Sequence, residues 1–367
     1  MKASQNSLNG IALFLLNSNV SGFMNYLSIF YCFVISLSIS LLIVLSNPLH
    51  ERLSADTLQG DQKFHQGIVP RVGGLAIFFS LILAYILFST DSLFFTILIC
   101  GLPVFISGLL EDIFKTVSAK HRLLAAIISA TLFIYLSGYH FTSVDIYFFD
   151  MIFDALFLFP ILTIIAVAAL SNAINIIDGF NGLASGSSGV MALSITWLAL
   201  EKGDSELAQM TLFFVAALAG FVVLNFPKGL LFLGDAGAYL CGFLLGVFAI
   251  LLVERNSEVS PLVLLVTFSY PITELLFSIF RKTLRKGHRP DRPDKVHFHM
   301  LVYRSFSRKL TQNKLYQNSA TGALMLLFCS IGPLLIISFP LSKTIALGCF
   351  FLIAVVYLLL YKKISLN

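Results

Sequence analysis

The chain has 367 residues, of which 57% are hydrophobic and only 12% are charged, and its formal net charge is +5. Soluble globular chains carry about a quarter charged residues, so this composition excludes the usual soluble enzymes and binding modules. Apolar stretches of roughly 17–25 residues, the length at which a helix spans a bilayer, recur along the whole chain. The sequence therefore predicts an all-α polytopic membrane protein that forms one membrane-embedded domain over residues 1–367.

The apolar stretches predict about eleven transmembrane helices. They are expected at 26–46, 73–89, 93–110, 121–138, 155–176, 184–200, 207–225, 231–253, 260–281, 318–340 and 342–361. The segment before them has a short apolar core and no clear cleavage site, so it is not interpreted as a cleaved signal peptide. Between the fourth and fifth helices, residues 139–150 alternate enough to predict a small outer hairpin.

The distribution of lysine and arginine predicts the orientation. The side with most of them carries the C-terminal tail, the boundary residue Arg281 and the loops 47–72, 111–122, 177–183, 226–230 and 282–317. It holds 20 of the 24 Lys and Arg residues, and cytoplasmic loops normally carry this excess. The N-terminus is therefore expected outside, and these loops and the C-terminus are expected in the cytoplasm.

Four carboxylates fall at or near this cytoplasmic boundary. Glu111 and Asp112 end the third helix, Asp178 ends the fifth, and Asp235 lies about one turn inside the eighth. Ionisable residues at membrane depth are costly and usually functional, although each of these could simply reach out to water at a helix end. Carboxylates that converge repel one another unless a cation joins them, and oxygen ligands suit Mg²⁺ or Mn²⁺. We therefore predict a shallow metal-dependent site on this side.

Glycines stand beside two of these aspartates, in "DGFNGLASG" and in "FLGDAGA", where Gly234 precedes Asp235. Glycine permits a sharp turn or a close backbone approach, and backbone amides exposed near a helix start bind phosphate. Packing between membrane helices explains some of the glycines, but it does not explain the adjacent aspartates. The two segments therefore indicate a phosphate ligand.

The loop 282–317 is basic and contains "GHRPDRPDKVHFHM". Attraction to anionic lipid accounts for most of its charge. Two prolines stiffen the segment, however, and the spacing of His297 and His299 could place both imidazoles on one side of an extended chain. Such a loop above a carboxylate cluster suits a diphosphate ligand. A zinc site is the less favoured alternative, because the carboxylates elsewhere offer only oxygen.

The motifs occur in an order that resembles a known family. They are "HQGIVPRVGG", "GLLEDIFKTVSAKHRLL", "NAINIIDGFNGLASG", "NFPKGLLFLGDAGA" and "DKVHFHM". Together they resemble the polyprenyl-phosphate N-acetylhexosamine-1-phosphate transferases of the family 4 glycosyltransferase type. That family includes the bacterial enzymes that start O-antigen, enterobacterial common antigen and teichoic acid synthesis, and the translocase that makes the first lipid-linked peptidoglycan precursor. The first and last motifs look more like the O-antigen branch.

The resemblance implies a reaction and its location. Polyprenyl phosphate, such as undecaprenyl phosphate, would attack the β-phosphate of a UDP-N-acetylhexosamine in a Mg²⁺-dependent step, giving the polyprenyl-diphospho-sugar and UMP. The protein would lie in the bacterial inner membrane with its active site in the cytoplasm, beneath the basic loop 282–317. No nucleic-acid partner is expected, and a homodimer is left open.

The resemblance also implies roles for individual residues. Asp235 matches the metal ligand, and Asp112 and Glu111 match a paired-carboxylate position that orients or deprotonates the lipid phosphate, with Asp112 a second candidate metal ligand. Asp178 is expected at the nucleotide-diphosphate and metal region. The residues expected to contact substrate are Lys63, Arg71, Arg122, Asn172, Asn175, Asn181, Gly234, His297 and His299.

Three positions depart from the family's pattern. Glu111 replaces the first aspartate of a pair, Asn181 stands where many relatives carry a second aspartate, and Met300 replaces a histidine. The metal or nucleotide role of Asn181 is therefore in question.

Two other classes of function remain as alternatives. A secondary transporter would use the carboxylates for ion coupling, but it should show an internal repeat and charges near mid-membrane. A membrane scaffold would bind only anionic lipid and would leave Asp178 and Asp235 without a purpose.

Overall fold

A computed structural model describes residues 21–46, 55–56, 69–89, 91–284, 296–310 and 313–366. The long helices are α2 (Ser21–Leu45), α4 (Gly73–Phe88), α7 (Ala119–Ser137), α9 (Phe159–Ile177), α10 (Leu183–Glu201), α11 (Ser205–Asn225), α12 (Gly234–Arg255), α14 (Ser269–Leu284), α17 (Lys314–Ser338) and α18 (Lys343–Ser365). The shorter elements are α5 (Ser92–Cys100), α6 (Leu102–Phe114), α8 (Tyr147–Ala155), α13 (Pro261–Thr267), α15 (Phe298–Val302), the π-helical turn η1 (Tyr303–Ser307) and α16 (Arg308–Leu310). Two short strands, β1 (Ala55–Asp56) and β2 (Val69–Pro70), pair antiparallel.

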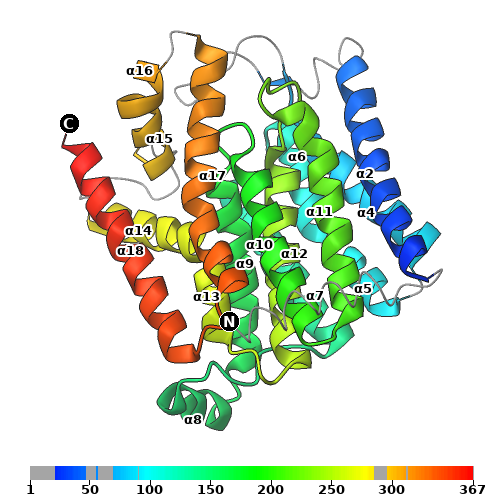
Figure 1. The fold of residues 1–367 in the computed structure, drawn as a ribbon, viewed down its shortest axis with the longest axis vertical. Helices are drawn as coiled ribbons and strands as arrows, with labels where there is room; N and C mark the ends of the chain where they lie inside the picture. The colour runs from blue at the N-terminus through cyan, green and yellow to red at the C-terminus, as the bar shows by residue number, and fades with distance from the viewer. Residues whose placement is uncertain are drawn as a thin grey trace.

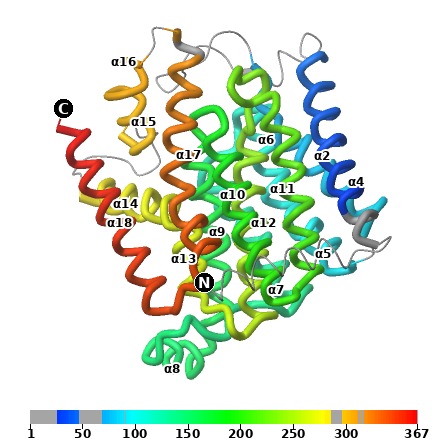
Figure 2. The backbone as a smooth tube through the Cα atoms, in the orientation of Figure 1, coloured from blue at the N-terminus to red at the C-terminus, as the bar shows by residue number. Residues whose placement is uncertain are grey.

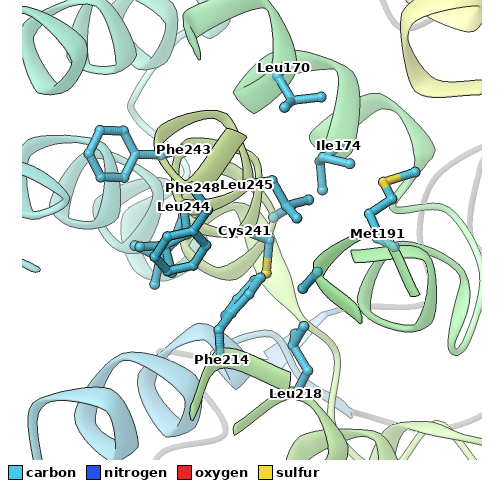
Figure 3. Packing of buried hydrophobic residues seen from close by; sticks show 14 of the residues in the cluster. Leu170, Ile174, Met191, Phe214, Leu218, Cys241, Phe243, Leu244, Leu245 and Phe248 are labelled. Atoms are coloured by element: carbon cyan, nitrogen blue, oxygen red, sulfur yellow. The ribbon is translucent and has the colours of Figure 1, made fainter. Parts of the chain in front are cut away.

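The helices form a bundle around α12, which is buried over its whole apolar length (Figure 1). It packs against α4, α6, α9 and α10. Side chains from the neighbouring helices, among them Ile174, Met191 and Phe214, gather around Cys241 of α12 (Figure 3). A helix that is apolar on all sides suits a fully buried position as well as a lipid-facing one, and the buried start of α12 carries the predicted metal ligand Asp235.

The prediction of an all-α membrane protein is confirmed, but the count of eleven spans is not. Within the described part of the chain, nine helices are long and apolar enough to cross a membrane, or ten if α13 and α14 form one bent span. The predicted helix at 73–89 has only 16 residues, about 24 Å at 1.5 Å per residue, which falls short of a bilayer core of ~30 Å. The predicted helix at 260–281 is bent by 81°. Pro271 cannot donate to the carbonyl of Thr267, which favours a break there.

The predicted outer hairpin at 139–150 is wrong. Residues 139–146 form no strand, although all of them are described, and the chain then enters α8. The Asp150 carboxylate accepts hydrogen bonds from the Val144 amide and the Ser143 hydroxyl, both at 2.7 Å. Such local side-chain bonds compete with strand pairing. Tyr147 and Phe148 remain exposed on α8, which is typical of a helix that lies in a membrane interface.

Two ends of the bundle can be distinguished. Figure 1 places α15 and α16 at one end and α8 at the other. At the edge of the bundle α18 packs along α13 and α14 (Figure 2). We call the end with α15 and α16 the basic end, because both helices belong to the basic segment 282–317.

Candidate active site

Asp112 lies at the centre of the basic end and is fully buried. Its two carboxylate oxygens accept hydrogen bonds from the amides of Asp235 and Ala236, each at 2.9 Å. The first amides of a helix have no partner within the helix, and a negative charge is favoured there. Asp112 therefore caps α12 and fixes the position of Asp235.

Gly234 allows the close approach between Asp112 and the start of α12, and it does not present an unoccupied group of backbone amides. Its φ is +74°, a conformation that favours glycine. A Cβ atom at this position would clash with the carbonyl oxygen of Arg71 and with the Asp112 carboxylate. The expected contact between Gly234 and substrate stays a prediction, and what the structure shows is close packing.

Asp235 is surrounded by donors from two helices and a loop. Arg122 donates to Oδ2, and Asn175 donates to Oδ1 at 3.0 Å. Nη2 of Arg71 lies 3.5 Å from Oδ1, and Nη1 of Arg122 also lies 3.8 Å from Oε1 of Glu111. The predicted residues Arg71, Arg122 and Asn175 therefore meet at the predicted metal ligand.

Positive charges separate the carboxylates. Arg71 lies between Asp112 and Asp235, at 3.9 Å from Asp112 Oδ1, and it is also near Asp178. Burial raises the pKa of Asp178 to about 7, while the Arg71 guanidinium acts in the opposite direction. Within the described residues, no three acidic, histidine or cysteine side chains are close enough together to hold a metal ion. The carboxylates thus gather at one end as predicted, with arginine side chains between them.

Asn172 lies at the edge of this group. Its Oδ1 accepts a hydrogen bond from the Tyr239 hydroxyl at 3.2 Å, and the Arg122 guanidinium carbon lies 5.8 Å from the centre of the Tyr239 ring. Asn172 and Asn175 are one turn apart on α9, so both reach the site from the same helix face. Lys63 lies outside the described residues.

Asn181 is 5% exposed and forms hydrogen bonds with neighbouring segments of the chain. Its amide donates to Oδ1 of Asn318 at 2.8 Å, and its side-chain Nδ2 donates to the carbonyl of Pro227 at 3.2 Å. Gly229 and Gly322 leave room for these contacts. Asn181 therefore joins the turn after Asp178 to α17 and to the loop before α12, and its predicted contact with substrate stays a prediction.

An Asn181→Asp variant is expected to be less stable than the parent. A carboxylate would face the Pro227 carbonyl oxygen with no proton to donate, and an unsatisfied buried polar group costs about 1–3 kcal/mol. The measurement is the thermal unfolding midpoint in detergent. Asn172→Asp is the matched control, because the oxygen of Asn172 is already an acceptor, so its midpoint should change little. A stable Asn181→Asp protein without activity would instead make Asn181 a substrate ligand.

The two histidines have different surroundings. Nδ1 of His297 lies 2.8 Å from Oε1 of Glu274, and the His297 side chain is 12% exposed. His299 is buried, and burial lowers its pKa to about 3, so it is neutral and cannot attract a diphosphate by charge. Their rings stack with centroids 5.5 Å apart, so both imidazoles lie on one side, but His299 belongs to the helix α15 and not to the extended segment that was predicted.

His299 connects the histidine segment with the turn after α9. A Cβ atom at Gly179 would lie 3.1 Å from His299 Nε2, and the Phe180 ring meets the His299 ring edge-on. The sequence reasoning missed Glu274, which holds the neighbouring His297. A carboxylate within the predicted span 260–281 was the signal that could have found it.

Comparison with known proteins places the chain among membrane transferases. Residues 94–253 match the model of the glycosyl transferase family 4. A Bacillus subtilis protein named probable undecaprenyl-phosphate N-acetylglucosaminyl 1-phosphate transferase is 29% identical over 276 residues, covering 72% of this chain and 76% of the relative. Undecaprenyl-phosphate alpha-N-acetylglucosaminyl 1-phosphate transferase of Escherichia coli O157:H7 is 32% identical over 264 residues, covering 66% and 68%. The resemblance carried by the motifs is thereby confirmed, and the chain belongs to glycosyl transferase family 4, the family of these polyprenyl-phosphate hexosamine-1-phosphate transferases.

Proposed function

We propose that the chain transfers an N-acetylhexosamine 1-phosphate from a UDP-sugar to polyprenyl phosphate and so starts a lipid-linked cell-surface polysaccharide of the O-antigen type. The observation that carries this proposal is Arg122. Its guanidinium is held by Asp235, yet its Nε is buried and has no hydrogen-bond partner among the described residues. A buried donor without a partner is costly, and an arginine in this state is suited to a phosphate oxygen.

The reaction needs positioning and charge compensation rather than covalent work by the protein. An oxygen of the lipid phosphate forms a bond to the β-phosphorus of the donor. The bond from that phosphorus to the bridging oxygen breaks, and UMP leaves with the electron pair. Arg71 and Arg122 are placed to bind the diphosphate, and such cations stabilise charge that develops in the transition state. In this proposal the site lies in the cytoplasm at a bacterial inner membrane, with the C-terminus on the same side.

The residues at the site fit Mg²⁺, with Mn²⁺ as an alternative. Mg²⁺ is usually held by one or two carboxylates together with water and substrate phosphates, rather than by a complete protein cage. Asp235 would hold it, with the oxygens of Asn175 and Asp178 nearby, so the lack of a three-ligand group among the described residues is compatible with the ion. When bound, Mg²⁺ neutralises charge on the diphosphate.

An apolar cavity supports the lipid substrate. It has a volume of about 270 Å³ and lies between α9, α12, α13 and α14. Its lining includes Leu170, Gly246, Phe268 and Leu275. A branched hydrocarbon chain would bury its surface there, at about 25 cal/mol per Å² removed from water. The cavity follows the bend between α13 and α14 and also reaches Phe141 and Val144.

The test is release of UMP by the purified protein. We expect UMP with polyprenyl phosphate, Mg²⁺ and at least one member of a panel of UDP-N-acetylhexosamines, covering GlcNAc, GalNAc, FucNAc and QuiNAc. Removal of the metal with EDTA should stop the release, and added Mg²⁺ should restore it. Omission of the lipid is the control. No UMP with any sugar, together with ion-coupled uptake in vesicles, would favour the secondary transporter instead.

A further inference from the structure

Glu274 is a buried carboxylate that the reaction described above does not use. It lies on α14 beyond the bend and is 0% exposed. Oε1 lies 2.8 Å from Nδ1 of His297, and Oε2 accepts hydrogen bonds from the Phe298 amide at 3.2 Å and the Tyr357 hydroxyl at 3.0 Å. All of its partners are donors, which is the environment of an ionised carboxylate. A buried charge with this set of bonds is retained only where it is fully compensated.

The bond to Glu274 determines which way the His297 ring is turned and what its Nδ1 contacts. A carboxylate can only accept, so Nδ1 carries the proton. Nε2 has no hydrogen-bond partner within the described part of the chain, and the side chain keeps some exposed surface. The His299 ring stacks behind it and reaches Gly179, the residue after Asp178. The imidazole is therefore next to the proposed site, with one nitrogen engaged and the other available.

The backbone of this segment has a separate anchor. The carbonyl oxygen of Val296 accepts hydrogen bonds from Nη1 of Arg281 at 2.9 Å and from the Tyr361 hydroxyl at 2.8 Å. Loss of the Glu274 carboxylate would thus leave the chain before α15 attached to α14 and α18. The contacts of this segment that depend on Glu274 are those with the His297 imidazole and with the Phe298 amide.

We propose that Glu274 is a positioning residue that acts through His297, fixing the orientation of the imidazole so that Nε2 forms a hydrogen bond with the nucleotide-sugar donor. Because Nδ1 is engaged by Glu274, Nε2 is the nitrogen that faces the donor. The inference rests on the proposed function, because it assigns the UDP-sugar as the ligand.

The test is a double-mutant cycle of Glu274→Gln and His297→Ala, with Tyr357→Phe as the matched control. Glu274→Gln should reduce kcat/KM for the UDP-sugar by about 10–100-fold, the range found for groups that orient a histidine. In the His297→Ala background the same change should have little further effect. Tyr357→Phe removes another bond to the same carboxylate and should keep kcat/KM near that of the parent, whatever its unfolding midpoint.

Two results would overturn the proposal. One is an equal, multiplicative loss from Glu274→Gln in the His297→Ala background, and the other is a Tyr357→Phe protein as impaired as Glu274→Gln. If Glu274→Gln does not fold, Glu274→Asp, which keeps the charge but shortens the side chain by one methylene and so withdraws it from His297, takes its place in the cycle. UDP binding by calorimetry is measured on the same variants. If the parent protein releases no UMP, the proposed function fails. The double-mutant cycle is then evaluated from the UDP dissociation constants, which still test whether Glu274 acts through His297.

Discussion

The Asp235→Asn variant is expected to fold and to reach the membrane, but to release UMP about 10²–10³-fold more slowly than the parent, the cost of removing one preorganised charge from such a site. The Asp235 carboxylate is where Arg71, Arg122 and Asn175 meet, and it is the first candidate to hold Mg²⁺. An amide keeps one acceptor oxygen but loses the charge that a metal requires. The unfolding midpoint should fall only modestly, because Glu111 still lies near Arg122.

Asp204→Asn is the matched control for this prediction. Asp204 begins α11, accepts the Leu207 amide, and lies 2.9 Å from Arg255, so it reproduces an aspartate at a helix start beside an arginine. The change should lower stability without lowering UMP release. Turnover retained by Asp235→Asn would remove this residue from the metal site, and turnover lost by Asp204→Asn would show that the assay reports folding rather than chemistry.

The Asp112→Asn variant is expected to lose both stability and activity. Asparagine supplies only one acceptor oxygen for the two amides that Asp112 binds, so its NH₂ group would face a backbone N–H inside the protein. An unsatisfied buried donor costs about 1–3 kcal/mol, which should lower the unfolding midpoint. UMP release should also fall, by about 10²-fold, because a small displacement of a catalytic group has an effect of this size.

Two measurements separate this explanation from direct catalysis by Asp112. A protein of full thermal stability with no turnover would contradict the capping role and support the catalytic role that the sequence predicted. Asp91→Asn is the control for loss of a helix cap. Asp91 accepts the Leu93 amide at the start of α5, so its loss should cost about 0.5–2 kcal/mol of stability and leave UMP release unchanged.

Several conclusions followed from the sequence alone because they depend on local chemistry. The length of the apolar stretches predicted a helical membrane protein, and every one of the eleven predicted segments is largely helical. Charges at helix ends predicted that the carboxylates and the loop motifs would share one end. The structure does bring Arg71, Arg122, Asn175 and Asp235 together there. The motif order predicted the family.

Predictions that depended on bending and pairing were less successful. The proline in "FSYPITE" is visible in the sequence, but an 81° bend depends on what packs against it. The alternation at 139–150 suggested strands, while the observed turn follows from the bonds of the Asp150 carboxylate. In both cases the pattern of residue types was compatible with two conformations. Packing selected the bend, and the bonds of Asp150 within its own segment selected the turn.

The sequence by itself determined the class, the family and the residue types at the site, because hydrophobic length, charge and motif order are properties of the chain. Only the tertiary structure decided what each residue contacts. It turned Asp112 toward the amides of α12, it buried Asn181 against Pro227, and it placed Glu274 against His297. These contacts join residues 23 to 123 positions apart, and the side-chain type alone cannot determine whether an oxygen faces a backbone amide, a histidine or a ligand. Packing around the central helix α12 makes that choice, because each buried polar group must find a partner within the fold.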